Sequence, residues 1–212
     1  MLVVKDVSKS FMGTKVLDKV NFSIYKGDRI AMMGPNGAGK TTIVRALLGF
    51  YHINSGKILV NGFDPIANRV DVLESISFIP QLPPPIKLSI EELLSFVEKS
   101  SNISREKIFK ESNRMDLDLK NQLKKPFFKL SGGMKQKLLI AIALSKKSNL
   151  LIFDEPTANL DPKGREKFYE LLTEIDTECS TLFITHRLDE IEGLVNRKIY
   201  MDLGKVVEDE TI

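Results

Sequence analysis

The stretch Arg29 to Gly49, RIAMMGPNGAGKTTIVRALLG, joins a short apolar run to a glycine-rich loop and then to a helical pattern. Residues 34–41 fit G-x-x-x-x-G-K-[ST], and in this strand–loop–helix setting the pattern predicts a phosphate-binding loop. Glycines let backbone N–H groups face phosphate oxygens, the lysine reaches the outer phosphates, and the threonine hydroxyl reaches Mg²⁺. The loop residues expected to contact a nucleotide are Gly34, Pro35, Asn36, Gly37, Ala38, Gly39, Lys40, Thr41 and Thr42.

Short apolar, β-branched segments recur along the chain and predict strands. They are residues 57–62, 75–80, 149–156, 180–186 and 197–204. Helical patterns lie between them, including one that follows an N-cap at Asp161 and a proline at position 162. Alternating strands and helices predict an α/β fold with a largely parallel sheet.

Two parts of the chain depart from this alternation. Residues 2–11 and 15–25 alternate apolar and polar around Met12-Gly13-Thr14, which predicts an antiparallel hairpin at the side of the sheet. From about residue 86 to 130 the pattern is helical and begins with a capping box, Ser89 and Glu92. We therefore expect a single domain over residues 1–212. Its α/β core and β subdomain would contain 1–85 and 148–212, and its inserted helical subdomain 86–147.

Composition limits the classes of function. Cys179 is the single cysteine, so an intramolecular disulfide is impossible, and the N-terminus lacks the pattern of a signal peptide. The longest apolar run, Leu138 to Leu144, has seven residues, whereas a membrane-spanning helix needs roughly 20. The net charge of +3 is too small to indicate a nucleic-acid partner.

Polar residues follow several predicted strands. Asp154 and Glu155 end the apolar run LLIF, and Gln81 and His186 follow two other strands. Because the carboxyl ends of parallel strands meet at one edge, we expect these side chains to converge there with Gly34. Asp154 would hold Mg²⁺ and Glu155 would act as general base on water. The alternative is a pair of solvated carboxylates in a turn.

The stretch LSGGMKQK, residues 130–137, places Ser131, Gly132 and Gly133 before an apolar helical run. Glycine costs roughly 1 kcal/mol relative to alanine within a helix, so two at a helix start suggest backbone N–H groups left open to an approaching anion. Plain capping by the serine is the alternative.

The chain as a whole resembles the nucleotide-binding subunit of ATP-binding-cassette (ABC) transporters, a P-loop NTPase of RecA-like fold. GPNGAGKT resembles the Walker A motif of that family, LSGGM its signature, LLIFDE its Walker B motif and ANLD (158–161) its D-loop. Gln81 matches the Q-loop and His186 the switch histidine. Met134 replaces the glutamine common in the signature, as in ATPases of the ABC-2 exporter type.

The resemblance implies ATP and Mg²⁺ as cofactors and a role for each motif. Phe11 would stack on adenine, although a core phenylalanine on a strand would look the same. Thr41, Gln81 and Asp154 would bind Mg²⁺. His186 would contact the γ-phosphate beside the catalytic Glu155. Ser131, Gly132, Gly133 and Asp161 would act across a dimer interface.

The resemblance also implies partners and a location. A homodimer, or a pair with a sister nucleotide-binding subunit, would hydrolyse ATP and drive transport of the export type through a separate transmembrane permease subunit. The chain would be cytoplasmic and peripheral on the inner face of the membrane. Open alternatives are a non-transport ABC ATPase, a scaffold for cofactor assembly, and another phosphate-loop protein such as a GTPase or small kinase, although no Asn-Lys-x-Asp is present.

Overall fold

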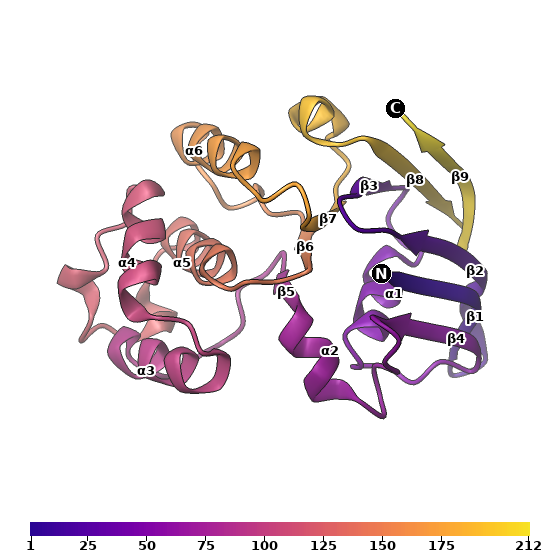
Figure 1. Ribbon diagram of the computed structural model, residues 1–212, viewed down its shortest axis with the longest axis horizontal. Helices are drawn as coiled ribbons and strands as arrows, with labels where there is room; N and C mark the ends of the chain where they lie inside the picture. The colour runs from indigo at the N-terminus through magenta and orange to yellow at the C-terminus, as the bar shows by residue number, and fades with distance from the viewer. The chain divides into compact units, whose positions relative to one another are not determined.

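The computed structural model describes residues 1–212, which divide into two compact units (Figure 1). The first unit contains Met1–Ile76, Asn149–Asp154 and Asp176–Ile212. The second contains Ser77–Ser148 and Glu155–Ile175. The functional boundaries expected from the sequence, with a signature subdomain at 86–147, remain a prediction.

An antiparallel sheet of three strands forms one part of the first unit. Its strand order is β2-β1-β4, with bounds β1 Leu2–Phe11, β2 Thr14–Ile24 and β4 Ser55–Val60. Phe11 pairs with Thr14 next to the turn, which confirms the expected N-terminal hairpin. The segment near 57–62 is a strand as expected, but it pairs antiparallel with β1.

In the first unit a second sheet has the strand order β6-β7-β3-β8-β9, in which β6, β7, β3 and β8 are parallel and β9 is antiparallel to β8. Their bounds are β3 Arg29–Met33, β6 Leu150–Asp154, β7 Ser180–Ile184, β8 Arg197–Asp202 and β9 Lys205–Thr211. Every residue of β6 and β7 is buried, as in parallel strands covered on both faces, and Phe153 stacks on Phe183 with ring centroids 4.7 Å apart. The antiparallel strand β9 was not expected from the sequence.

The first unit also contains two α-helices and two 3-10 turns. They are α1 Lys40–Leu47, α2 Arg69–Ser75 and the 3-10 turns Leu188–Glu190 and Glu192–Leu194. Strand β5, Ile76–Ile79, begins where the first unit passes into the second.

The second unit is helical (Figure 1). Its elements are α3 Ile90–Ser101, α4 Arg105–Arg114, α5 Gly132–Ser145, α6 Pro162–Thr173 and the 3-10 turns Lys120–Gln122 and Phe127–Lys129. The capping box at the start of α3 is confirmed, because Ser89 Oγ accepts from Glu92 N at 3.2 Å and Ser89 N donates to Glu92 Oε2 at 2.7 Å. Ile90, Leu94, Ile108, Phe127 and Leu138 lie in the shared apolar core.

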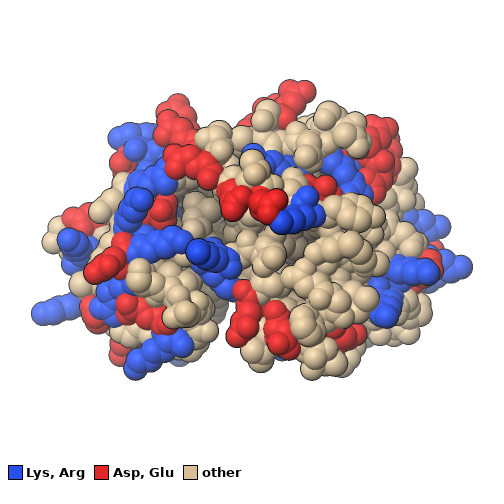
Figure 2. All heavy atoms as spheres, viewed as in Figure 1, with Lys and Arg blue, Asp and Glu red and all other residues tan.

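None of the helices combines the length and apolar character of a membrane-spanning helix. On the face seen in Figure 2, Lys and Arg side chains are interspersed with Asp and Glu. Mixed charge of this kind favours solubility over binding to a uniformly charged partner.

Candidate active site

The glycine-rich loop joins β3 to α1 within the first unit. Gly34, Gly37 and Gly39 have φ of 138°, 86° and 100°, a region that residues with a Cβ rarely adopt. A Cβ at Gly34 would lie 2.0 Å from Met201 O, and one at Gly39 would lie 2.7 Å from Leu17 Cδ2. At Gly37 no atom lies within 4 Å of that position. The loop is therefore closely packed on the protein at two glycines and open at the third.

The lysine of the loop holds its ammonium group against the loop backbone. Lys40 Nζ donates to Gly34 O at 2.6 Å and to Pro35 O at 3.0 Å. Helix α1 begins at Lys40, has no acidic residue in its first turn, and exposes Thr41 beside the lysine. A positive helix end, an ammonium group and an open glycine together fit the phosphates of a nucleotide.

Three strand ends lie next to one another in the first unit. Asp154, the last residue of β6, is level with Ile184 of β7, and Ile184 is level with Met32 of β3. The phosphate loop follows β3 directly, and His186 lies two residues beyond β7. The segments that carry the loop, Asp154 and His186 therefore leave the sheet at the same edge, as the parallel arrangement predicts.

The acidic member of this group is buried, and the histidine is exposed. Asp154 is 6% exposed. No group of three or more His, Cys, Asp or Glu side chains forms a metal cage. Mg²⁺ in nucleotide sites needs no such cage, because it takes one or two protein ligands together with phosphate oxygens and water. The buried Asp154 carboxylate and the Thr41 hydroxyl are oxygen ligands of the kind that this ion prefers.

Phe11 lies at the end of β1 and is 38% exposed, so it is not a core residue. Its ring meets Tyr51 edge-on with centroids 5.1 Å apart, and Lys9 Nζ lies 4.8 Å from the ring centre. The contact leaves part of the aromatic surface open to solvent.

The remaining expected residues belong to the second unit. Glu155 directly follows Asp154 in the chain and has a left-handed backbone with φ of 46°. Gln81 is exposed, and its carbonyl accepts a hydrogen bond from Asn159 Nδ2 at 3.1 Å. This link between the segments of the Q-loop and the D-loop was not found by sequence reasoning, because no local pattern marks Asn159.

Helix α5 begins at the signature residues of the second unit. Ser131 is the N-cap, and its Oγ accepts from Met134 N at 3.3 Å, so the serine does cap the helix. A Cβ at Gly132 would come no closer than 3.8 Å to Asn159 Oδ1, an ordinary contact. Met134 packs against the helical core, which accounts for an apolar side chain at this position.

Asp161 occupies the N-cap of α6 as expected, but its side chain makes no capping hydrogen bond. Its Oδ1 lies 3.7 Å from Lys137 Nζ of α5 instead, and the Asp161 side chain is 63% exposed. The carboxylate therefore belongs to the surface between α5 and α6.

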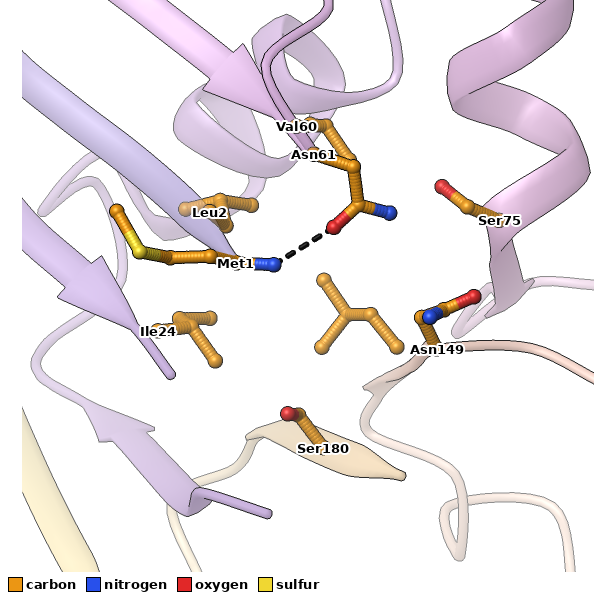
Figure 3. A pocket seen from close by; sticks show the side chains of 9 residues that line it. Met1, Leu2, Ile24, Val60, Asn61, Ser75, Asn149 and Ser180 are labelled. Carbon is orange, nitrogen blue, oxygen red and sulfur yellow. Dashed lines mark hydrogen bonds between the residues drawn. The ribbon is translucent and has the colours of Figure 1, made fainter. Parts of the chain in front are cut away.

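A small pocket lies elsewhere in the first unit, at the starts of β6 and β7 (Figure 3). Its volume of about 20 Å³ is room for about one water molecule. Met1 N donates to Asn61 Oδ1 there at 2.6 Å. Because the phosphate loop and Asp154 lie at the other ends of the strands, this pocket is not the nucleotide site.

Residues 17–158 match the family model described as "ABC transporter". The chain belongs to the ABC transporter family. This membership rules out the GTPase and small-kinase alternatives. The chain is an ATP-binding, ATP-hydrolysing domain, and ATP and Mg²⁺ are its ligands.

Alignments to several ABC proteins extend over almost the whole chain. It is 35% identical over 208 residues to the lantibiotic transport ATP-binding protein SrtF of Streptococcus pyogenes, covering 98% of this chain and 89% of that protein. It is 31% identical over 204 residues to the zinc import ATP-binding protein ZnuC of Buchnera aphidicola, covering 95% and 81%. The chain spans 8% of the length of rat ATP-binding cassette sub-family A member 2, with 33% identity over 193 residues, which is 90% of this chain.

The fold has solved counterparts. A structure described as the ATP binding subunit of an ABC transporter superposes with a TM-score of 0.90 and 27% identity, over 100% of this chain and 90% of that chain. The expected P-loop NTPase fold, with an antiparallel N-terminal sheet beside a parallel core, is confirmed.

Proposed function

We propose that this chain is the ATPase subunit of an export-type ABC transporter and that it acts as a head-to-tail dimer around two ATP molecules. The partner in the dimer is a second copy or a paired nucleotide-binding subunit, and a separate transmembrane permease subunit carries the cargo. The chain works in the cytoplasm, against the inner face of the membrane. One observation carries this proposal: the phosphate loop and the signature start at α5 belong to different compact units of the same chain.

The phosphate loop binds the triphosphate in this proposal. The loop of residues 34–42 surrounds it with the backbone N–H groups of its members other than Pro35, and Lys40 transfers its hydrogen bonds from the carbonyls of Gly34 and Pro35 to phosphate oxygens. Phe11, exposed at the end of β1, stacks on the adenine. Thr41, Asp154 and Gln81 hold Mg²⁺, which neutralises charge on the phosphates when bound.

Glu155 is the general base that takes a proton from the attacking water. His186 contacts the γ-phosphate and orients the water with Glu155, and Gln81 connects the site to the permease. Glu155, His186 and Gln81 each come shortly after the carboxyl end of a strand. Parallel α/β sheets bind their ligands at such strand ends. Support for these roles comes from the adjacent strand ends of the first unit.

The signature start supplies the other half of the site. Ser131, Gly132 and Gly133 of one subunit contact the γ-phosphate held by Lys40 of the other, where the positive end of α5 favours an anion. Asp161, exposed beside α5, acts across the same interface. Export is supported by Met134, which resembles the signature of ABC-2 exporters.

Two substitutions test the ATPase mechanism. Lys40→Ala removes the ammonium group and should abolish ATP binding or turnover. Glu155→Gln should bind ATP, lower turnover by roughly 10²- to 10⁴-fold, and accumulate as an ATP-bound dimer in size-exclusion chromatography. Glu170→Gln, on the exposed side of α6, is the matched control and should behave as wild type. Wild-type turnover by Glu155→Gln would remove the residue as base.

A second experiment tests the partner and the direction. Purification of the chain from membranes should recover a polytopic permease, and inverted vesicles with that complex should accumulate the cargo when ATP is added outside. A chain that is fully active and partner-free in the cytosol would contradict the transporter. ATP-driven release from inverted vesicles would contradict export.

A further inference from the structure

The side chain of Gln136, in the second turn of α5, is completely buried although glutamine is usually exposed. Its Nε2 donates to the carbonyl of Pro156 at 3.1 Å, and its Oε1 has no hydrogen-bond partner. The amide orientation follows from chemistry, because Oε1 cannot donate to a carbonyl oxygen. A buried amide that leaves its own acceptor unsatisfied lowers stability, so the fold alone gives little reason for this glutamine.

The carbonyl that Gln136 holds belongs to an unusual turn. Glu155, directly before Pro156, has φ of 46°, a left-handed conformation that a residue with a Cβ keeps only when its surroundings enforce it. Within the turn, Ala158 N donates to Glu155 O at 3.2 Å. Proline has no N–H, so it contributes no donor of its own. The Gln136 amide is a donor from outside the turn, and it fixes the carbonyl of Pro156, the residue after Glu155.

Helix α5 contacts the segment after Glu155 at two further places. A Cβ on Gly133 would lie 3.1 Å from Asn159 O, and Lys137 Nζ lies 3.7 Å from Asp161 Oδ1. Of these contacts, the Gln136 hydrogen bond reaches the residue next to the carboxylate. Because a helix moves as a rigid body, Gln136 and the signature start one turn earlier move together.

We infer that Gln136 is a positioning residue for Glu155. The Gln136 hydrogen bond makes the position of Glu155 depend on the position of α5 in the same subunit. Because the start of α5 contacts the ATP of the partner subunit, this dependence couples the two ATP sites of the dimer. This inference rests on the proposed function, in which the signature start contacts the partner's ATP and Glu155 serves the ATP of its own subunit.

The first test is Gln136→Met, which keeps the length of the side chain but cannot donate. We expect kcat to fall by roughly tenfold to a hundredfold, as for a misplaced catalytic group, with unchanged KM and unchanged ATP binding per subunit. The thermal midpoint should not fall correspondingly, since the unsatisfied Oε1 is removed as well. Gln136→Leu repeats the measurement if the methionine variant folds poorly. Unchanged kcat, or a kcat that falls only with the fraction of chain able to bind ATP, would overturn the inference.

Ser145→Ala is the matched control on the same helix. Its buried hydroxyl donates to Ala141 O at 2.7 Å, away from the Glu155 turn. Losing that bond should lower the thermal midpoint and leave kcat unchanged.

A double-mutant cycle separates this inference from the proposed function. If Gln136 acts through Glu155, Gln136→Met should cause no further loss in a Glu155→Gln background. Additive losses would overturn the positioning role. Wild-type turnover by Glu155→Gln alone would overturn the proposed function. An inactive Glu155→Gln together with a fully active Gln136→Met would overturn only this inference.

Discussion

The glycines of the phosphate loop and those of the signature start are required for different reasons. Gly34 and Gly39 have left-handed φ, and a Cβ at either would collide with the protein. Gly132 and Gly133 are helical, and a Cβ at Gly132 would meet an ordinary contact at 3.8 Å. The first pair is needed for folding. A Cβ at Gly133 would lie 3.1 Å from Asn159 O, so close packing within the chain gives one reason for that glycine. Gly132 has no such reason and costs helix stability, so we expect its benefit to come from a molecule that binds there.

Gly34→Ala should produce the largest effect on folding. Its Cβ would lie 2.0 Å from Met201 O, and its φ of 138° excludes an ordinary side chain. We expect the free energy of unfolding to fall by about 3 kcal/mol or more in urea denaturation. Gly62→Ala is the matched control, because its φ is 87° but nothing lies within 4 Å. It should lose only about 1 kcal/mol. Equal losses in the two variants would contradict a packing requirement at Gly34.

Gly132→Ala should have the opposite effect on stability and should lower activity. Replacing a helical glycine by alanine should raise the free energy of unfolding by up to about 1 kcal/mol. Turnover of ATP should nevertheless fall by roughly tenfold or more, because the methyl group displaces the phosphate. Gly193→Ala, where nothing lies within 4 Å, is the control and should leave turnover unchanged. A destabilised Gly132→Ala would show that the fold itself requires the glycine.

Ser89→Ala tests a helix start that needs no ligand. It removes the N-cap of α3 and should lower the free energy of unfolding by about 1 kcal/mol, without a change in turnover. Hydrogen bonds from the Ser89 side chain and then its backbone lower the pKa of Glu92. The carboxylate therefore stabilises the fold above its unfolded pKa of about 4.3, and this contribution disappears as pH falls through the lower folded pKa. Urea midpoints between pH 3 and 7 should show a smaller acid dependence in the variant.

Cys179 provides the smallest and most local readout. Burial, followed by the charge of Asp176, raises the pKa of its thiol to about 11. At pH 8 the thiolate fraction is then roughly 200-fold below that of a free cysteine, and alkylation by iodoacetamide should be correspondingly slow. Because Cys179 and the phosphate loop share the first unit, Gly34→Ala should accelerate alkylation, whereas Gly132→Ala should not. Rapid alkylation of the wild-type chain would contradict the burial of Cys179.

Local signals in the sequence predict much of this fold. The glycine loop between β3 and α1, the hairpin of β1 and β2 and the capping box at Ser89 are each specified by a few neighbouring residues. The pairing of β4 with β1 was not specified, because apolar periodicity identifies a strand but not its partner. Strand β9 was missed because its exposed, acidic sequence KVVEDET lacks the pattern of a half-buried strand.

The candidate site divides in the same way. Sequence order and strand ends predict that the phosphate loop, Asp154 and His186 lie together, and in the first unit the ends of the strands that precede or carry them are adjacent. The left-handed backbone of Glu155 and the buried amide of Gln136 depend on tertiary contacts between distant segments. No window of sequence contains that information.

The glycine at position 132 has a consequence for variants selected by stability alone. A screen for thermal tolerance should favour alanine at position 132, because alanine stabilises the helix of the folded chain. The screen would thereby enrich variants that still bind ATP but hydrolyse it slowly. Positions 34 and 39 would withstand the same screen, since their substitution is penalised by folding itself. Substitutions that lower activity would therefore collect at the start of α5 without being detected by a stability screen, while the phosphate loop kept its glycines.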